Sequence, residues 1–350
     1  MSFILPKDNP YLIGHEKAEM MFLDSFKKGT LHHALLISGI KGIGKATFAY
    51  KIARFLLQEN PNKFLAEKLD VSPSDPVFKQ ISGASNPNFL AIERDYTETD
   101  KKKIIKAIKD GEPLDDDDLL NLKKSAVIKV DEVRQINQFL SKTSFDGAWR
   151  VVIVDSIDEL NAAGANAILK ILEEPPAKTI LLLISHQPSK LLPTIKSRCA
   201  KMTLESLSEN NVASLIRRYA PEVSEANVAL LSKISSGSIG RALNYVLYDG
   251  LEIYQKLQNI VYAGERFDLN TALGVASIAA SDENVWYLTI ELLLKMLSDM
   301  ASAGQKMEEI YSLYALISKL SDEVFGLNMD KKQALLNVFY QISKVVNDVC

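Results

Sequence analysis

A glycine-rich stretch, Gly39-Ile40-Lys41-Gly42-Ile43-Gly44-Lys45-Ala46-Thr47, constrains the fold of this chain more than any other feature. It fits the phosphate-binding loop pattern G-x-x-x-x-G-K-[ST] at every position but the last. The apolar run 34–38 before it predicts a buried parallel strand, and apolar residues at helical spacing follow it. Such a loop aims backbone N–H groups at an anion. The candidate nucleotide-binding residues here are Gly39, Gly42, Gly44, Lys45 and Thr47.

The loop lacks the side chain that would hold magnesium. A phosphate-binding loop places a Ser or Thr hydroxyl on Mg²⁺, and this chain has Ala46 at that position. Thr47 lies about 100° further around the helix, which makes it a poor substitute. Two alternatives stay open, weak binding of ATP or ADP and an empty site in the native protein, and the second is slightly favoured.

A second motif, Arg-Val-Val-Ile-Val-Asp at 150–155, predicts a buried strand that ends in a carboxylate. This is the Walker-B pattern, in which Asp155 can hold Mg²⁺ directly or through water. ATPases of the AAA+ type usually follow this Asp with a Glu that polarises the attacking water. This chain has Ser156 there, which is a second departure from a hydrolytic site.

Composition limits the other kinds of site. The two cysteines, Cys199 and Cys350, are too few for a disulfide framework or a cysteine zinc site, and they suit a reducing cytoplasm. The adjacent His32 and His33 would face opposite sides of a strand, so we expect no metal there. No window is long and apolar enough to cross a membrane, and a net charge of −3 gives no overall basic field for unaided nucleic-acid binding.

The alternation of elements predicts three domains. Residues 1–205 carry five apolar strands alternating with helices, which is typical of a parallel three-layer α/β fold. Within it, residues 59–125 are the least regular stretch, and we interpret the acidic run 115–118 as a solvated loop. Residues 206–250 predict a three-helix unit, and 251–350 predict several longer helices.

Three runs are more specific than the loop: 151–155 (VVIVD), 166–176 (NAILKILEEPP) and 192–199 (LPTIKSRC). Together they resemble the delta-prime subunits of bacterial DNA polymerase III clamp loaders, which belong to the AAA+ clamp-loader family. The resemblance covers residues 1–250 by motif, and it extends to the C-terminus by helical pattern and length alone.

That resemblance implies an AAA+ module over 1–205, a helical lid over 206–250 and a helical collar over 251–350. In the family, the collar joins this subunit to the motor gamma or tau subunits and to delta in a hetero-pentamer. The assembly loads the sliding clamp onto primed DNA during DNA replication, as part of the DNA polymerase holoenzyme. Delta-prime itself does not hydrolyse ATP.

The resemblance also implies roles for two arginines. In the Ser-Arg-Cys motif, Arg198 is the arginine finger that reaches the γ-phosphate in a neighbour's site. Guanidinium is always charged and can fork to two phosphate oxygens, which suits this catalytic role in trans. Arg241 matches the lid arginine that senses nucleotide in active relatives, and a structural contact is an equally good interpretation of it.

The chain departs from the family in one further respect. Most members carry a cysteine-rich zinc module between the first strands, whereas this chain has no cysteine before Cys199. We therefore predict that no zinc is bound and that other contacts hold residues 59–125 together.

Two other functions compete with this interpretation. An active ATPase of the gamma or tau type is supported by Lys45, Asp155 and Arg241 and opposed by Ala46 and Ser156. A stand-alone nucleic-acid-binding module has little support, because the sequence shows no platform of aromatic and basic residues.

Overall fold

The computed structural model describes residues 4–110, 122, 124–125, 127–141, 147–262, 267–302 and 307–347. The chain divides between residues 206 and 207 into two compact units. The acidic run 115–118 and Cys350 lie outside the described residues. The predicted division of 206–350 into a lid and a collar stays a prediction.

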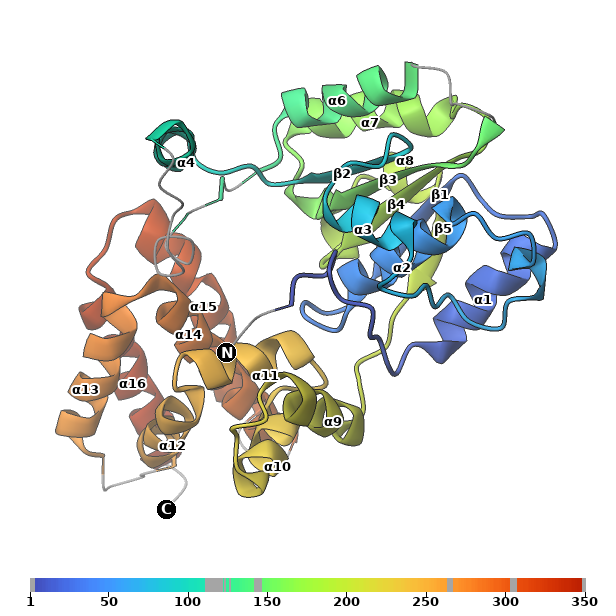
Figure 1. Cartoon of the computed structure of the whole chain (residues 1–350). Coiled ribbons are helices and arrows are strands. Elements are labelled where there is room, and N and C mark those ends of the chain that lie inside the picture. Colours follow the sequence, from blue (N-terminus) through green and yellow to red (C-terminus); the bar gives the residue numbers. More distant parts are fainter. Residues whose placement is uncertain are drawn as a thin grey trace. The chain divides into compact units, whose positions relative to one another are not determined.

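A parallel five-stranded sheet forms the centre of the first unit (Figure 1). Its strand order is β2-β3-β4-β1-β5, and every pair of neighbours in it is parallel. The strands coincide with apolar runs that are followed by a glycine or end in a polar residue. The predicted strands and the predicted α/β fold class are confirmed. The strands are β1 (Ala34–Ser38), β2 (Phe89–Glu93), β3 (Arg150–Asp155), β4 (Thr179–Ser185) and β5 (Ala200–Thr203).

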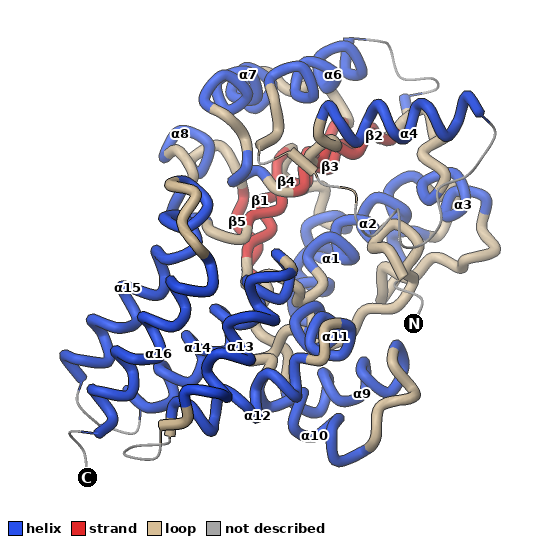
Figure 2. The backbone as a smooth tube through the Cα atoms, turned by 90° about the vertical axis from the view of Figure 1, so that its left-hand side faces the viewer, coloured by secondary structure: helices blue, strands red, loops and turns tan. Residues whose placement is uncertain are grey.

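Helices cover both faces of this sheet, which makes three layers (Figures 1 and 2). Successive residues of a strand point to opposite faces. On β3, Val151 and Ile153 pack with the first, second and third helices, whereas Val152 and Val154 pack with the later ones. These helices are α1 (Glu16–Lys27), α2 (Lys45–Leu57) and α3 (Pro76–Ser82) on one face, and α6 (Val130–Ser141), α7 (Ala162–Glu173) and α8 (Pro193–Lys196) on the other.

The prediction for the two adjacent histidines was wrong in its geometry. Strand β1 begins at Ala34, so His32 and His33 precede the strand and are not forced to opposite sides. Their rings stack with centroids 4.3 Å apart, and the Nε2 of His33 donates to the carbonyl of Leu172 at 3.0 Å. Both rings thus lie against backbone at the start of the strand.

Residues 58–75 connect α2 to α3, and side chains from α1 and α2 hold them in place. The ammonium of Lys51 lies 2.7 Å from Asp70 and 3.5 Å from Glu19, and Glu19 also accepts the Leu69 N–H at 2.5 Å. Phe64, in the short 3₁₀ helix η1 (Lys63–Leu65), stacks on Phe26 with centroids 5.1 Å apart. No group of His, Cys, Asp or Glu among the described residues could hold a metal ion.

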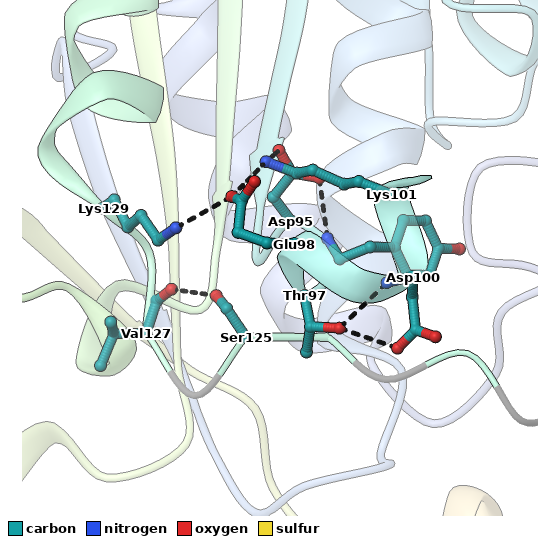
Figure 3. Close-up of polar contacts among 9 residues, drawn as sticks. Asp95, Thr97, Glu98, Asp100, Lys101, Ser125, Val127 and Lys129 are labelled. Carbon is teal, nitrogen blue, oxygen red and sulfur yellow. Dashed lines mark hydrogen bonds and ion pairs between the residues drawn. The ribbon is translucent and has the colours of Figure 1, made fainter. Parts of the chain in front are cut away.

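A second connection leads from edge strand β2 to α6 and includes helix α4 (Glu98–Asp110) (Figure 1). Thr97 caps the helix, because its hydroxyl lies 2.8 Å from Asp100 and accepts the Asp100 N–H at 3.3 Å. Lys101 pairs with Asp95 at 2.8 Å (Figure 3), and the Ser125 N–H donates to the Asp95 carbonyl at 2.7 Å. Asp95, just after β2, and Ser125, shortly before α6, are therefore tied to each other.

The regular elements described in the second unit are all helices, and a serine N-cap opens each of the first three. The caps are Ser208, Ser224 and Ser238, whose side chains accept N–H groups of the first turn. No described helix of the chain is long and apolar enough to span a membrane. The helices are α9 (Glu209–Tyr219), α10 (Glu225–Ile234), α11 (Ile239–Leu247), α12 (Gly250–Val261), α13 (Leu269–Ser281), α14 (Glu283–Ser302), α15 (Met307–Gly326) and α16 (Lys331–Asn347).

Candidate nucleotide site and surface arginine

The glycine loop joins β1 to α2 at the carboxyl end of the sheet, as predicted. Gly39, Gly42 and Gly44 have φ of 148°, 81° and 105°, values that residues other than glycine rarely adopt. A Cβ on Gly39 would also lie 2.6 Å from the carbonyl oxygen of Leu204. The loop conformation therefore requires these glycines.

Lys45, the first residue of α2, folds back onto its own loop. Its ammonium donates to the carbonyl oxygens of Gly39 at 2.6 Å and Ile40 at 2.7 Å. Burial lowers the pKa of Lys45 to about 8, and the negative charges of Asp155 and Asp158 oppose that shift. The loop thus holds a positive charge whose strength depends on pH near neutrality.

Asp155 ends β3 and lies across the sheet from Glu93 of β2 and Ile184 of β4. Burial raises the pKa of Asp155, whereas the Ser156 hydroxyl, which donates to it at 3.2 Å, and the charge of Lys45 lower that pKa. The two predicted site residues Lys45 and Asp155 therefore act on each other electrostatically. The structure brings the Walker-A lysine and the Walker-B acid to one end of the sheet.

The site fits a phosphate better than it fits magnesium. The glycine loop and Lys45 are the parts that an anion needs. Ala46 offers no oxygen to a metal, and Thr47 is buried in the first turn of α2. The Ser156 hydroxyl donates its hydrogen bond to Asp155. Asp155 could hold Mg²⁺ through its carboxylate, but neither Ala46 nor Ser156 adds a second oxygen for the metal.

Two residues near the loop were missed by the sequence interpretation. The buried His15 donates from Nε2 to the Ile43 carbonyl at 2.7 Å, and burial lowers its pKa. The Cδ1 of Leu12 lies 2.8 Å from the position that a Cβ on Gly44 would take. Leu12 and His15, which precede α1, thus pack against the glycine loop. No sequence motif marks an apolar residue and a histidine in this position as loop contacts.

Asp158 has a structural role beside the site. Its Oδ2 accepts the N–H groups of His186 at 2.6 Å and Gln187 at 3.1 Å, just after β4. Burial and the nearby charge of Lys45 lower the pKa of His186 to about 4, so this imidazole is neutral at physiological pH. Asp158 therefore fixes the turn after β4, next to the loop, and does not replace the missing glutamate at Ser156.

Arg198 lies at the other end of the sheet. It follows α8 and precedes β5, which runs parallel to β1. The glycine loop follows the last residue of β1, so the length of a strand separates the two, about 13–17 Å for four to five residues. The Arg198 side chain is 35% exposed, and its guanidinium pairs with Glu173 at 2.8 Å. Burial raises the pKa of the neighbouring Cys199 to about 11.

Arg241 lies in the second unit, on α11. Its Nε forms an ion pair with Glu291 of α14, and its backbone N–H donates to Ser238 at 3.2 Å. The side chain is therefore engaged within its own helical unit. A role for Arg241 in sensing nucleotide stays a prediction.

Comparison with known proteins gives one family. Residues 14–208 match the family model described as DNA polymerase III, delta subunit. A DNA polymerase III subunit delta' of Pseudomonas aeruginosa is 30% identical over 206 residues, 59% of this chain and 53% of that protein. The subunit delta' of Escherichia coli is 28% identical over 253 residues, 71% of this chain and 66% of that protein. The chain thus spans between about half and two thirds of these relatives.

A gamma subunit and a solved structure of a gamma-related protein are also similar to this chain. A DNA polymerase III subunit gamma of Buchnera aphidicola is 27% identical over 243 residues, 68% of this chain and 57% of that protein. A gamma-subunit-related protein of Thermotoga maritima has a TM-score of 0.41 and 15% identity, over 92% of this chain and 99% of that one.

Proposed function

The chain belongs to the DNA polymerase III delta-subunit family, and from this premise we propose that it is a clamp-loader subunit that does not hydrolyse ATP. In this proposal it donates Arg198 to the ATP site of a neighbouring subunit. Its partners are then the gamma or tau and delta subunits of a hetero-pentamer, with the sliding clamp and primer-template DNA reached through that complex. The names of its relatives, delta', gamma and tau, support membership of such a complex.

One observation carries the role of Arg198. This arginine and the chain's own glycine loop lie at opposite ends of the parallel sheet. A strand length is more than an arginine side chain spans, so Arg198 does not reach a phosphate held by its own loop. The partial exposure of its side chain leaves it accessible to an acceptor on another molecule, which supports the proposal. A forked, permanently charged group is suited to neutralise charge on a transferring phosphoryl group.

The chain's own loop supports the absence of hydrolysis. Phosphoryl transfer depends on positioning and on charge stabilisation by a metal ion. Ala46 supplies no metal oxygen, and Ser156 supplies no carboxylate to orient the attacking water. We propose accordingly that any ATP or ADP at Lys45 is held weakly, that no zinc is bound, and that the loop serves the fold.

The test uses the isolated chain and the assembled loader. The isolated chain should show negligible ATP hydrolysis with Mg²⁺ and primed DNA. Arg198→Ala should leave the loader assembled and slow its DNA-stimulated hydrolysis, because one ATP site loses its finger, an effect of about 10³–10⁵ at a single site in other systems. Arg134→Ala is a matched control, since Arg134 is also exposed and ion-paired. An Arg198→Ala loader with the wild-type rate would rule out the finger.

An active ATPase of the gamma or tau type is the second candidate function. The proximity of Lys45 to Asp155 favours it, because these are the two charged groups that such a site needs. DNA-stimulated turnover by the purified chain, measured together with its Lys45→Ala and Lys45→Arg variants, would establish this alternative and refute the first proposal.

A further inference from the structure

Glu173 and Arg198 form an ion pair that no sequence motif predicted. The Nη2 of Arg198 lies 2.8 Å from Oε1 of Glu173, and its Nη1 donates to the carbonyl oxygen of Thr194 at 3.0 Å. A guanidinium has five N–H donors in a fixed plane. These two acceptors engage one donor on each terminal nitrogen and fix the orientation of the plane. The remaining donors are available to a further acceptor.

The fold brings the two residues together at the amino end of the sheet. Helix α7 runs back from the carboxyl end of β3, so its last residue, Glu173, lies just ahead of β4. Helix α8 runs back in the same way, which places Arg198 just ahead of β5. The two helices contact each other. The pair therefore sits on the sheet edge that faces away from the chain's own glycine loop.

The helix dipole makes the position of Glu173 unfavourable for a carboxylate. It is the last residue of α7, and a second carboxylate, Glu174, follows at the C-cap. The C-terminal end of a helix carries partial negative charge, which favours Lys, Arg or His there. Glu173 thus gains nothing from its own helix. The cation of Arg198 offsets this repulsion, so the value of an acid at position 173 lies in the pairing.

We propose that Glu173 is a positioning residue for Arg198, an inference that rests on the proposed function of Arg198 as a finger. A long arginine side chain samples many rotamers, and ordering it during the reaction would raise the barrier. Glu173 and the Thr194 carbonyl order it beforehand and leave its other donors for a neighbour's phosphate. Because the Glu173 side chain is half exposed, water competes for its carboxylate and weakens the ion pair with the guanidinium.

The experiment compares variants in the assembled loader. Glu173→Gln should lower the kcat of DNA-stimulated hydrolysis by about two- to fivefold, the range for an exposed ion pair, with the KM for ATP unchanged. Glu174→Gln removes the adjacent carboxylate and should behave as wild type. In the Arg198→Ala background, Glu173→Gln should have no further effect, because its only route to the reaction is then gone.

The outcomes separate the two proposals. A wild-type rate for Glu173→Gln, or an effect that persists beside Arg198→Ala, would overturn the positioning role and leave the finger standing. A wild-type rate for Arg198→Ala would overturn the finger itself. NMR relaxation of the Arg198 Nε–H group in the isolated chain tests the pair without the loader. Its order should fall in Glu173→Gln and not in Glu174→Gln, and an unchanged order would also overturn the positioning role.

Discussion

Lys51 holds residues 58–75 against the first unit through its ion pairs with Glu19 and Asp70, and Lys51→Met tests this. Methionine keeps an unbranched apolar stem in place of the lysine stem and removes the charge. The side chain of Lys51 is 5% exposed, and those of its partners Glu19 and Asp70 are 14% and 61% exposed. Asp70 can return to water at little cost. Glu19 is left enclosed, with the Leu69 N–H as its partner among these contacts.

The expected loss follows from those exposures. An exposed pair contributes about 0–1 kcal/mol, whereas breaking a buried pair costs about 3–5 kcal/mol. One carboxylate here is enclosed and the other is open, so we expect a loss of about 2 kcal/mol in the free energy of unfolding of residues 2–206. For a unit of this size, that corresponds to a fall in Tm of about 4–8 °C.

Urea unfolding provides the assay. The chain has two tryptophans, Trp149 in the first unit and Trp286 in the second. In a Trp286→Phe background shared by all proteins compared, the emission of Trp149 reports the first unit. Lys17→Met is the matched control, because the Lys17 pair with Glu205 is 81% exposed on both sides at 3.8 Å. Equal stability of the two variants would refute the argument that Lys51 fastens this segment.

Three further predictions concern the site. An NMR titration of the Lys45 ammonium should have its midpoint near pH 8 rather than 10.5. Because the unfolded state then binds more protons between these values, the wild type should gain stability relative to Lys45→Met as pH rises from 8 to 10.5. His15→Ala should cost about 1–2 kcal/mol and speed amide exchange in residues 39–46 more than His32→Ala does, since it frees a buried carbonyl. In a Cys350→Ser background, Cys199 should resist a thiol reagent at pH 8 until the protein unfolds, because burial raises its pKa to about 11; rapid native labelling would contradict this.

Local pattern was enough to predict the sheet and the loop. β1 and β3 begin and end where expected, because a buried strand reads as an apolar run and its ends coincide with a glycine and an aspartate. The glycines of the loop are likewise fixed by the backbone angles of one short turn. Such features depend on residues that are neighbours in the chain, and a single sequence contains them.

The contacts that tertiary folding creates could not be predicted in this way. Glu173 meets Arg198 across 25 positions of chain, and Lys51 meets Asp70 across 19, through the packing of separate elements. The acceptors of Lys45 are carbonyls, which every residue has, so no side-chain pattern reveals that the lysine bonds to its own loop. The histidine prediction failed because it placed His32 and His33 within a strand, whereas β1 starts only at Ala34.

The folded-back Lys45 makes the usual mutational test of a phosphate-binding loop ambiguous in this chain. Its ammonium bridges the carbonyls of Gly39 and Ile40 and so acts as an internal ligand that closes the turn. Replacing it would release two carbonyls as well as a cation. A loss of function after such a change would measure the order of the loop together with any contact to nucleotide. Lys45→Arg, which keeps the charge, is therefore needed beside Lys45→Ala before either is taken as evidence about nucleotide.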